Sequence, residues 1–202
     1  MSRLMVVTAG LSQPSSTRLL ADLLSSATQE ALAARGGVEV EVVELRPLAH
    51  AITDALLTGF ATGDLAAAQE AVASADGLIA VTPVFSGSFS GLFKTFFDVL
   101  EPGTLEDTPV LVAATAGTAR HSLVLEHALR PLFSYLRAVV VPTSVFAASE
   151  DWGSSESGGA VALRQRVDRA AGQLADAVAS RPALHRDDPF GDVPDFSTML
   201  GG

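Results

Sequence analysis

Short apolar runs alternate with segments of helical periodicity along most of this 202-residue chain. Three runs, Leu4–Thr8, Gly77–Thr82 and Pro109–Thr115, are almost continuously apolar, which is typical of strands covered by helices on both faces of a parallel sheet. The run Val38–Leu45 instead alternates Val with Glu and predicts an edge strand with one wetter face. A fifth apolar run, Val139–Phe146, is the last predicted strand.

The segments between these runs carry apolar residues at a helical period. We expect helices over Ser16–Ala34, Asp64–Ser74, Gly91–Leu100, Ala119–Leu136 and Ala160–Ala179. Asp64 is the expected N-cap of the second helix. The segment Arg46–Gly63 is expected to be a loop with one helical turn at most. This alternation predicts an α/β fold, a doubly wound sheet with right-handed crossovers.

The length suits one domain, which we place at residues 1–180. Residues 181–202 are expected to form a C-terminal tail that is extended or partly disordered. The tail contains four large apolar residues: Phe190, Phe196, Met199 and Leu200. It is therefore either a frayed terminus or a segment that packs in part on a neighbouring subunit.

The composition excludes several classes of function. Asp and Glu (23) outnumber Lys and Arg (13), and a chain of net charge −10 lacks the basic face that binds nucleic acid. The absence of cysteine excludes disulfide scaffolds, thiolate metal sites and cysteine nucleophiles. The four histidines show no ligand spacing, so we expect no metal site. No apolar run reaches the roughly 18 residues of a membrane span, and we expect a cytoplasmic protein.

The loop after the first predicted strand has the composition of an anion site. Gly10 is followed by several hydroxyl side chains and Arg18, just where the first helix is expected to begin. The hydroxyls belong to Ser12, Ser15, Ser16 and Thr17. Free backbone N–H groups and the positive end of the helix dipole favour a phosphate there. The alternative is a simple N-cap, for which one serine suffices.

The loop after the third predicted strand combines small residues with two phenylalanines. Pro83 fixes the turn and Gly87 permits a close backbone approach. Phe85 and Phe89 flank the loop and form an apolar shelf on which a flat ring can rest. The alternative is a tight strand-to-helix turn whose phenylalanines belong to the core.

The loop after the fourth predicted strand is again small and hydroxyl-rich. Its backbone N–H groups can bind the carbonyls or ring nitrogens of a heterocycle, and His121 is expected to cap the following helix. These three loops contain no obvious acid–base pair. A site of hydroxyls, glycines, aromatic rings and backbone amides suits a cofactor that carries its own chemistry.

At these loops the sequence resembles the NADPH-dependent FMN reductase family. It looks most like the flavin reductase components of alkanesulfonate-type two-component monooxygenases. The matching blocks are Gly10–Leu20, Ala75–Leu100 and Thr115–Leu136, and the middle block is the most specific. The resemblance implies a flavodoxin-like fold, with a five-stranded parallel sheet in the order 2-1-3-4-5.

The resemblance also implies a set of cofactor-binding residues. Those implied to hold the FMN phosphate are Ser12, Ser15, Ser16 and Thr17. Those implied to lie along the ribityl chain and the isoalloxazine are Thr82, Pro83, Val84, Phe85 and Ser86. Those implied to meet the ring from the opposite loop are Thr115, Ala116 and Gly117, with Thr118 and His121 on the nicotinamide side. No side chain is implied to be catalytic, because the backbone near Gly117 and Thr118 positions the rings.

The activity implied by the resemblance is hydride transfer from NADPH or NADH to FMN, with the reduced flavin passed to a partner flavin-dependent monooxygenase. Two alternatives stay open. One is a reductase of quinones, azo compounds or metal ions with tightly bound FMN, and the other is a flavodoxin-type electron carrier. The resemblance also implies a homodimer or homotetramer, with Phe93, Phe96, Phe97 and the fourth helix at the contact. The alternative is that these side chains are buried against the sheet within one subunit.

Overall fold

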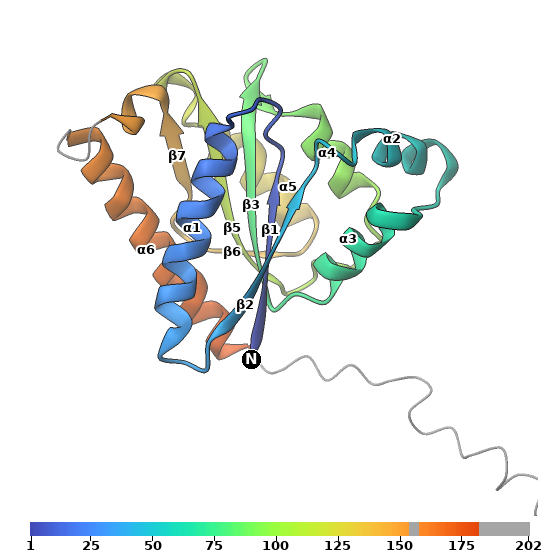
Figure 1. The fold of residues 1–202 in the computed structure, drawn as a ribbon, viewed down its shortest axis with the longest axis horizontal. Helices are drawn as coiled ribbons and strands as arrows, with labels where there is room; N and C mark the ends of the chain where they lie inside the picture. Colours follow the sequence, from blue (N-terminus) through green and yellow to red (C-terminus); the bar gives the residue numbers. More distant parts are fainter. Residues whose placement is uncertain (154–157, 182–202) are drawn as a thin grey trace, which may run out of the picture.

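The computed structural model describes residues 1–153 and 158–181 (Figure 1). The strands are β1 (Ser2–Thr8), β2 (Val38–Glu44), β3 (Gly77–Phe85), β4 (Ser88–Phe89), β5 (Pro109–Ala116), β6 (Val139–Val140) and β7 (Val145–Ala148). The α-helices are α1 (Ser16–Ala33), α2 (Ala49–Thr58), α3 (Gly63–Ala73), α4 (Gly91–Asp98), α5 (Arg130–Tyr135) and α6 (Gly158–Ser180). Two 3₁₀ turns, η1 (Ala119–His121) and η3 (Ser149–Trp152), and a π-helix, η2 (Leu125–Leu129), complete the elements.

The predicted α/β class and the doubly wound arrangement are confirmed. The described strands form one sheet in the order β2-β1-β3-β5-β6, in which β7 also pairs with β5. These pairings are parallel, and only the two-residue β4 runs antiparallel, against β3. The expected edge strand is confirmed too, since β2 pairs with β1 alone and its Glu39, Glu41 and Glu44 are exposed.

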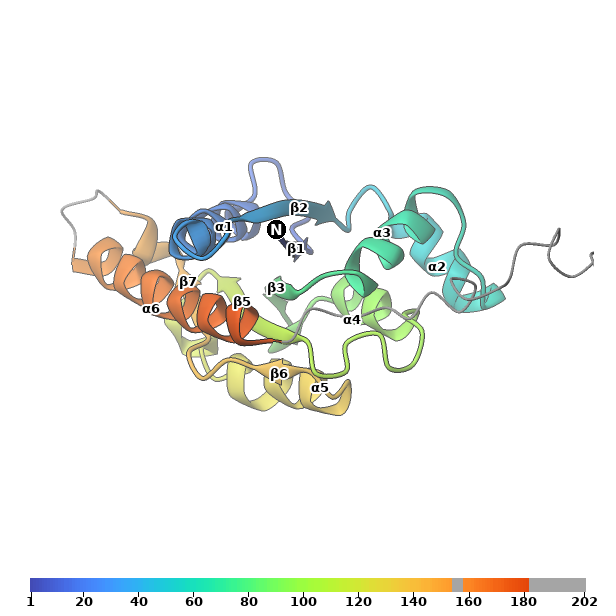
Figure 2. The same ribbon diagram turned by 90° about the horizontal axis from the view of Figure 1, so that it is seen from below.

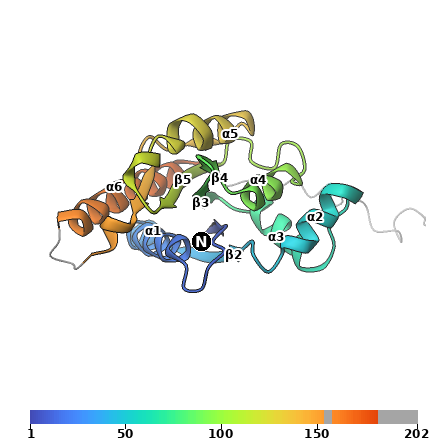
Figure 3. The same ribbon diagram turned by 90° about the horizontal axis from the view of Figure 1, so that it is seen from above.

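Two helical layers enclose the sheet, as Figures 2 and 3 show from its two ends. In β1, Leu4 and Val6 belong to one core cluster, together with residues of α1 and α6. The alternating Met5 and Val7 belong to the other cluster, with residues of α2, α3, α4 and α5. Side chains of a strand point alternately to opposite faces, so an unbroken apolar strand supplies both clusters at once.

The phenylalanines of α4 lie inside this second cluster. Phe93, Phe96 and Phe97 are at most 2% exposed, and the Phe97 ring centroid lies 5.0 Å from that of Phe133 on α5. Their rings meet one another at tilted or edge-on angles. The expectation that these three side chains form a contact between subunits is therefore wrong, because the core of a single chain already buries them.

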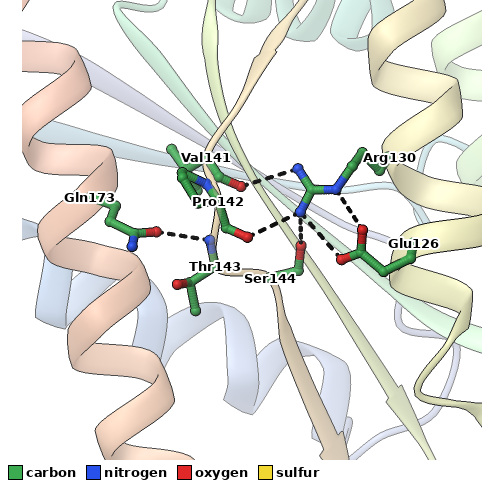
Figure 4. A network of polar contacts seen from close by, with 7 residues as sticks. All are labelled: Glu126, Arg130, Val141, Pro142, Thr143, Ser144 and Gln173. Atoms are coloured by element: carbon green, nitrogen blue, oxygen red, sulfur yellow. Dashed lines mark hydrogen bonds and ion pairs between the residues drawn. The ribbon is translucent and has the colours of Figure 1, made fainter.

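The fifth predicted strand is divided into β6 and β7. Pro142, in the interval between them, has no N–H to offer to a sheet ladder. Arg130 instead binds this interval, donating hydrogen bonds to the carbonyl oxygens of Val141 (3.3 Å) and Pro142 (3.1 Å) and to Oγ of Ser144 (3.0 Å) (Figure 4). The N–H of Thr143 donates to Oε1 of Gln173 at 2.8 Å. Side chains from two helices thus replace the missing sheet hydrogen bonds.

Three helix predictions also need correction. The segment expected to be a loop contains the ten-residue helix α2, which ends at Gly59 in the left-handed conformation (φ 80°). Helix α3 begins at Gly63 after the N-cap Thr62, so Asp64 lies in its first turn and is not the cap. The single helix expected over Ala119–Leu136 is divided among η1, η2 and α5. Pro131, near the start of α5, cannot donate a helical hydrogen bond.

Among the described residues, no helix is long and apolar enough to cross a membrane. Residues 182–202 of the expected C-terminal tail lie outside the described part of the chain.

Candidate functional site

Three loops meet at the carboxyl edge of the sheet, at the top of Figure 1. They follow β1, β3 and β5, which are neighbours in the sheet. The hydroxyls of Thr17, in the first turn of α1, and Thr115, near the end of β5, lie 2.8 Å apart and are buried. This contact joins the first loop to the third. Both side chains were expected to face the cofactor, and in this structure their hydroxyls bond each other.

The first loop forms a pocket of about 280 Å³ at the N-terminus of α1. Ser15 caps this helix, since its Oγ accepts a hydrogen bond from the N–H of Arg18 at 3.2 Å. A Cβ at position 10 would lie only 2.1 Å from that same Oγ, so Gly10 is required for the serine to cap the helix. Ser12 also lines the pocket, and Ser16 is exposed at the first residue of the helix.

One residue that lines this pocket has a buried hydroxyl without a hydrogen-bond partner among the described residues. Thr8, the last residue of β1, is 2% exposed and lines the pocket. Within residues 1–153 and 158–181, its Oγ1 is the one buried side-chain nitrogen or oxygen atom that lacks a hydrogen bond. A buried hydroxyl without a partner costs about 1–3 kcal/mol. A ligand oxygen in the pocket would supply that partner.

The charged groups beside the pocket largely neutralise one another. The guanidinium of Arg18 donates to Asp22 at 2.8 Å and also contacts Glu44. The hydrogen bond with Asp22 is the main cause of a raised pKa of Arg18, which is therefore held as a cation against these two carboxylates. Arg46 lines the same pocket, is exposed, and has no ion pair within the described part of the chain.

The second loop is a tight hairpin between β3 and β4. Val84 pairs with Phe89 and Phe85 with Ser88, and the two residues of the turn, Ser86 and Gly87, both have positive φ (50° and 80°). Positive φ at both turn positions is the geometry that matches the twist of paired strands. The side chain of Phe85 is 47% exposed, beside the edge where the loops meet.

Two residues of this loop serve the fold. The Phe89 ring lies 6.1 Å from that of Phe93 and packs against the core while staying partly exposed, so Phe85 is the more open ring of the expected shelf. Thr82 is fully buried, and its hydroxyl accepts from the N–H of Ser90 at 3.0 Å while donating to the carbonyl of Pro83 at 2.9 Å. The side chain of Thr82 is thus already satisfied, whereas Val84 and Pro83 are partly exposed.

The third loop leaves open space at its glycine. A Cβ added to Gly117 would meet no atom within 4 Å, and the residue is exposed next to the partly buried Ala116. The hydroxyl of Thr118 accepts from the N–H of Arg120 at 3.4 Å and caps η1. His121, at the end of η1 and exposed, is therefore not the capping residue that the sequence suggested.

The described residues contain no group of three or more His, Cys, Asp or Glu side chains placed to hold a metal ion. The residue that sequence reasoning missed is Thr8. Its signal was available, since a hydroxyl residue ends an otherwise apolar buried strand directly before a glycine turn. Arg46 was missed as well, because a lining position after β2 depends on how β1 and β2 pair.

Comparison with known proteins gives a consistent result. The family model for NADPH-dependent FMN reductase matches residues 2–153. An FMN reductase (NADPH) of Pseudomonas aeruginosa is 38% identical over 150 residues, which are 74% of this chain and 78% of that protein. The NADH-dependent FMN reductase SfnE of Pseudomonas putida is 38% identical over 162 residues, or 80% and 85% of the two chains.

Solved structures agree with these relatives. The crystal structure of an oxidoreductase from Corynebacterium diphtheriae superimposes with a TM-score of 0.86 at 48% identity, covering 90% of this chain and 99% of that one. The apo form of the NADH:FMN oxidoreductase EmoB superimposes with a TM-score of 0.75 at 27% identity, covering 96% and 100%. The described fold is thus shared along nearly the whole length of both chains.

Proposed function

The chain belongs to the NADPH-dependent FMN reductase family, and we propose that it transfers a hydride from NADPH or NADH to FMN. The observation that carries the proposal is the pocket at the N-terminus of α1, which is lined by Ser12, Ser15 and Thr8, the last with a buried Oγ1 that has no hydrogen-bond partner among the described residues. A phosphate bound there would receive hydrogen bonds from the helix N-terminus and from these hydroxyls. Such a site needs no side chain that acts as a general base.

The residues present fit FMN at both of its ends. Ser12 and Ser15 line the pocket and can contact the phosphate, and Thr8 gains a partner if a phosphate oxygen reaches it. At the other end, Phe85 offers an exposed apolar ring and Gly117 has open space where a side chain would lie, so each can accept a flat ring beside it. Arg18 carries one positive charge against the two carboxylates of Asp22 and Glu44, so binding of the anion rests on hydroxyls, backbone amides and the exposed Arg46.

FMN, when bound, supplies a ring that accepts a hydride from a reduced nicotinamide. The protein's own contribution is placement. In this proposal the open space at Gly117 admits the rings, and the exposed Phe85 side chain offers an apolar surface beside them. Holding two reactants in a reactive arrangement supplies several kcal/mol of the barrier reduction, of a possible total of about 7–11 kcal/mol. Thr118 and the exposed His121 lie on the same loop, where they can contact the nicotinamide amide.

The acceptor of the electrons, in this proposal, is free FMN that leaves the site after reduction. Support comes from exposure, since Ser12, Ser16, Phe85 and Gly117 all face the surface rather than a closed chamber. An open site favours exchange of the flavin over permanent retention. We therefore propose that the reduced FMN is delivered to a flavin-dependent monooxygenase, in the cytoplasm, where both nucleotides are held. A homodimer or homotetramer is part of the same proposal and is supported by the family resemblance alone.

The variant Gly117→Val tests this site. Because a Cβ there meets nothing within 4 Å, the substitution leaves the apo protein folded and fills only the space assigned to the rings. We expect the unfolding midpoint to stay near that of the wild type, and NADPH oxidation in the presence of FMN to fall by at least about tenfold as the reactive stacking is lost. An unchanged oxidation rate in the folded variant would remove the ring site from this loop.

A retained flavin would point to the other reductase class. FMN that stays with the protein through dialysis, together with turnover of a quinone or an azo compound in place of free FMN, would replace the proposed acceptor. Binding of FMN without any oxidation of NADPH or NADH would instead identify an electron carrier.

A further inference from the structure

Two cations and two carboxylates line the pocket at the N-terminus of α1. They are Arg18 and Asp22 on α1, Glu44 at the end of β2, and Arg46 two residues further along the chain. The guanidinium of Arg18 donates to Asp22 at 2.8 Å and also pairs with Glu44. Without Arg46 these groups carry one net negative charge, and with it their charges balance. Arg46 therefore decides whether the charged lining repels an anion.

The backbone that carries Arg46 is fixed beside the pocket. The N–H of Leu45 donates to the carbonyl oxygen of Thr8 at 3.0 Å, so the pairing of β1 with β2 continues one residue beyond Glu44. Leu45 itself is fully buried. The N–H of Ala49 then donates to the carbonyl oxygen of Arg46 at 3.3 Å, which closes a turn. Arg46 thus follows directly on the residue bonded to Thr8, whose buried Oγ1 has no partner among the described residues.

The guanidinium of Arg46 is available to a ligand. Its side chain is exposed and takes part in no ion pair or side-chain hydrogen bond within residues 1–153 and 158–181. A phosphate monoester carries a charge of about −1.5 to −2 at pH 7. A guanidinium can bind two of its oxygens at once. Arg18 cannot serve in the same way while two carboxylates hold it.

We propose that Arg46 and Glu44 act on the bound flavin in opposite directions. Arg46 makes the site select a flavin with a terminal phosphate over riboflavin, which has the same ring and ribityl chain but no phosphate. Glu44 weakens binding of the phosphate, because its carboxylate lines the same pocket and holds Arg18. This inference rests on the proposed function, and it gives a physical reason for a flavin that exchanges instead of staying bound.

The affinities for FMN and riboflavin, measured by quenching of flavin fluorescence, test the role of Arg46. In Arg46→Gln the Kd for FMN should rise at least about tenfold, the loss expected for a hydrogen bond to a charged group. The Kd for riboflavin should stay unchanged. Arg46→Lys keeps the charge and should retain most of the selectivity. The unfolding midpoint should not move in either variant, because the side chain has no described partner.

Arg3→Gln is the matched control. Arg3 lies in β1 at the opposite end from Thr8, and 49% of its side chain is exposed. Like Arg46→Gln, this substitution makes the net charge of −10 more negative by one. It should leave the Kd values of both flavins unchanged. A rise in the Kd for FMN equal to that in Arg46→Gln would mean that overall charge sets the affinity, and would overturn the role of Arg46.

Glu44→Gln tests the opposing role. The Kd for FMN should fall about fivefold, which is the effect of one unit charge on another about 4 Å away in water. Stopped-flow measurement should show slower release of FMN, while riboflavin is unaffected. Arg46→Gln/Glu44→Gln should bind FMN more tightly than Arg46→Gln, because Arg18 loses one of its two carboxylate partners. Unchanged or weaker binding of FMN in Glu44→Gln would overturn the role of Glu44.

The outcomes separate this inference from the proposed function. An Arg46→Gln protein that still oxidises NADPH with FMN, and whose Kd values for FMN and riboflavin change equally or not at all, would overturn the selectivity assigned to Arg46 and leave the proposed function standing. A wild-type protein that binds neither flavin would refute the proposed function, and this inference with it.

Discussion

Replacing Thr8 by valine should move the stability of the apo protein and its affinity for FMN in opposite directions. Thr8 is 2% exposed, and its Oγ1 has no hydrogen-bond partner in the part of the chain that the structure describes. Valine has nearly the same shape, so Thr8→Val creates no cavity and removes only an unsatisfied polar group. We expect the free energy of unfolding to rise by about 1 kcal/mol, the lower end of the cost of such a group.

The affinity for FMN should fall in the same variant. A hydrogen bond to a charged phosphate contributes about 1.5–3 kcal/mol, so its loss raises the Kd for FMN by roughly 10- to 100-fold. Urea unfolding of the apo protein measures the first effect, and quenching of flavin fluorescence on titration measures the second. A less stable Thr8→Val protein that binds FMN as tightly as the wild type would refute the assignment of this pocket to the phosphate.

Thr82→Val is the matched control. Thr82 is as deeply buried, but its hydroxyl bonds both the N–H of Ser90 and the carbonyl of Pro83. The same substitution there leaves the buried N–H of Ser90 without an acceptor and should lower the free energy of unfolding by about 1–3 kcal/mol. Opposite signs for the two variants would separate an unsatisfied hydroxyl from the general effect of threonine-to-valine replacement.

Three other predictions follow from single contacts. Gly10→Ala displaces the Ser15 cap and should cost about 1 kcal/mol in urea unfolding; in Gly10→Ala/Ser15→Ala the two losses should be less than additive, and full additivity would contradict the clash. The hydrogen bond from Arg130 lowers the pKa of Glu126 from its ordinary 4.5, so the ion pair contributes fully to stability above that pH and its contribution is lost as the pH falls below it. The difference in unfolding free energy between the wild type and Glu126→Gln should therefore shrink as the pH falls. A difference that does not change with pH would contradict this prediction. NADPH differs from NADH by a 2′-phosphate, which Arg120 can bind because this exposed cation has no described carboxylate partner. Arg120→Ala should therefore lower kcat/KM for NADPH about tenfold and leave that for NADH unchanged. Equal losses for the two nucleotides would refute a role in binding the 2′-phosphate.

Much of the fold could be predicted because the central strands are buried on both faces. An unbroken run such as Val110–Ala114 is typical of a strand covered on both faces, and the handedness of its connection follows from the crossover rule, whereas the strand order came from the family resemblance. Helix α2 escaped prediction because it buries little, only Ile52 and Ala55, while Leu56 and Leu57 point outward. Its left-handed Gly59 was the signal that could have marked the end of a helix.

The loops of the site could be located from sequence, but the use of each side chain could not. Four hydroxyls in a glycine turn predict an anion site, yet whether a hydroxyl faces ligand or protein depends on contacts across the sheet. Thr17 meets Thr115, 98 residues further along the chain, and Thr82 bonds Ser90. No periodicity encodes those pairings. The unpartnered Thr8 likewise becomes visible only once every neighbour is in place.

Anaerobic mixing of the protein and FMN with NADPH, or with NADH, tests the proposed reaction most directly when the visible flavin absorbance is recorded. We expect rapid bleaching that is slowed when deuterium replaces the transferred hydrogen at C4 of the nicotinamide, since hydride transfer between the two rings is the reaction assigned to the site. FMN that binds to the protein but is bleached by neither nucleotide would contradict it.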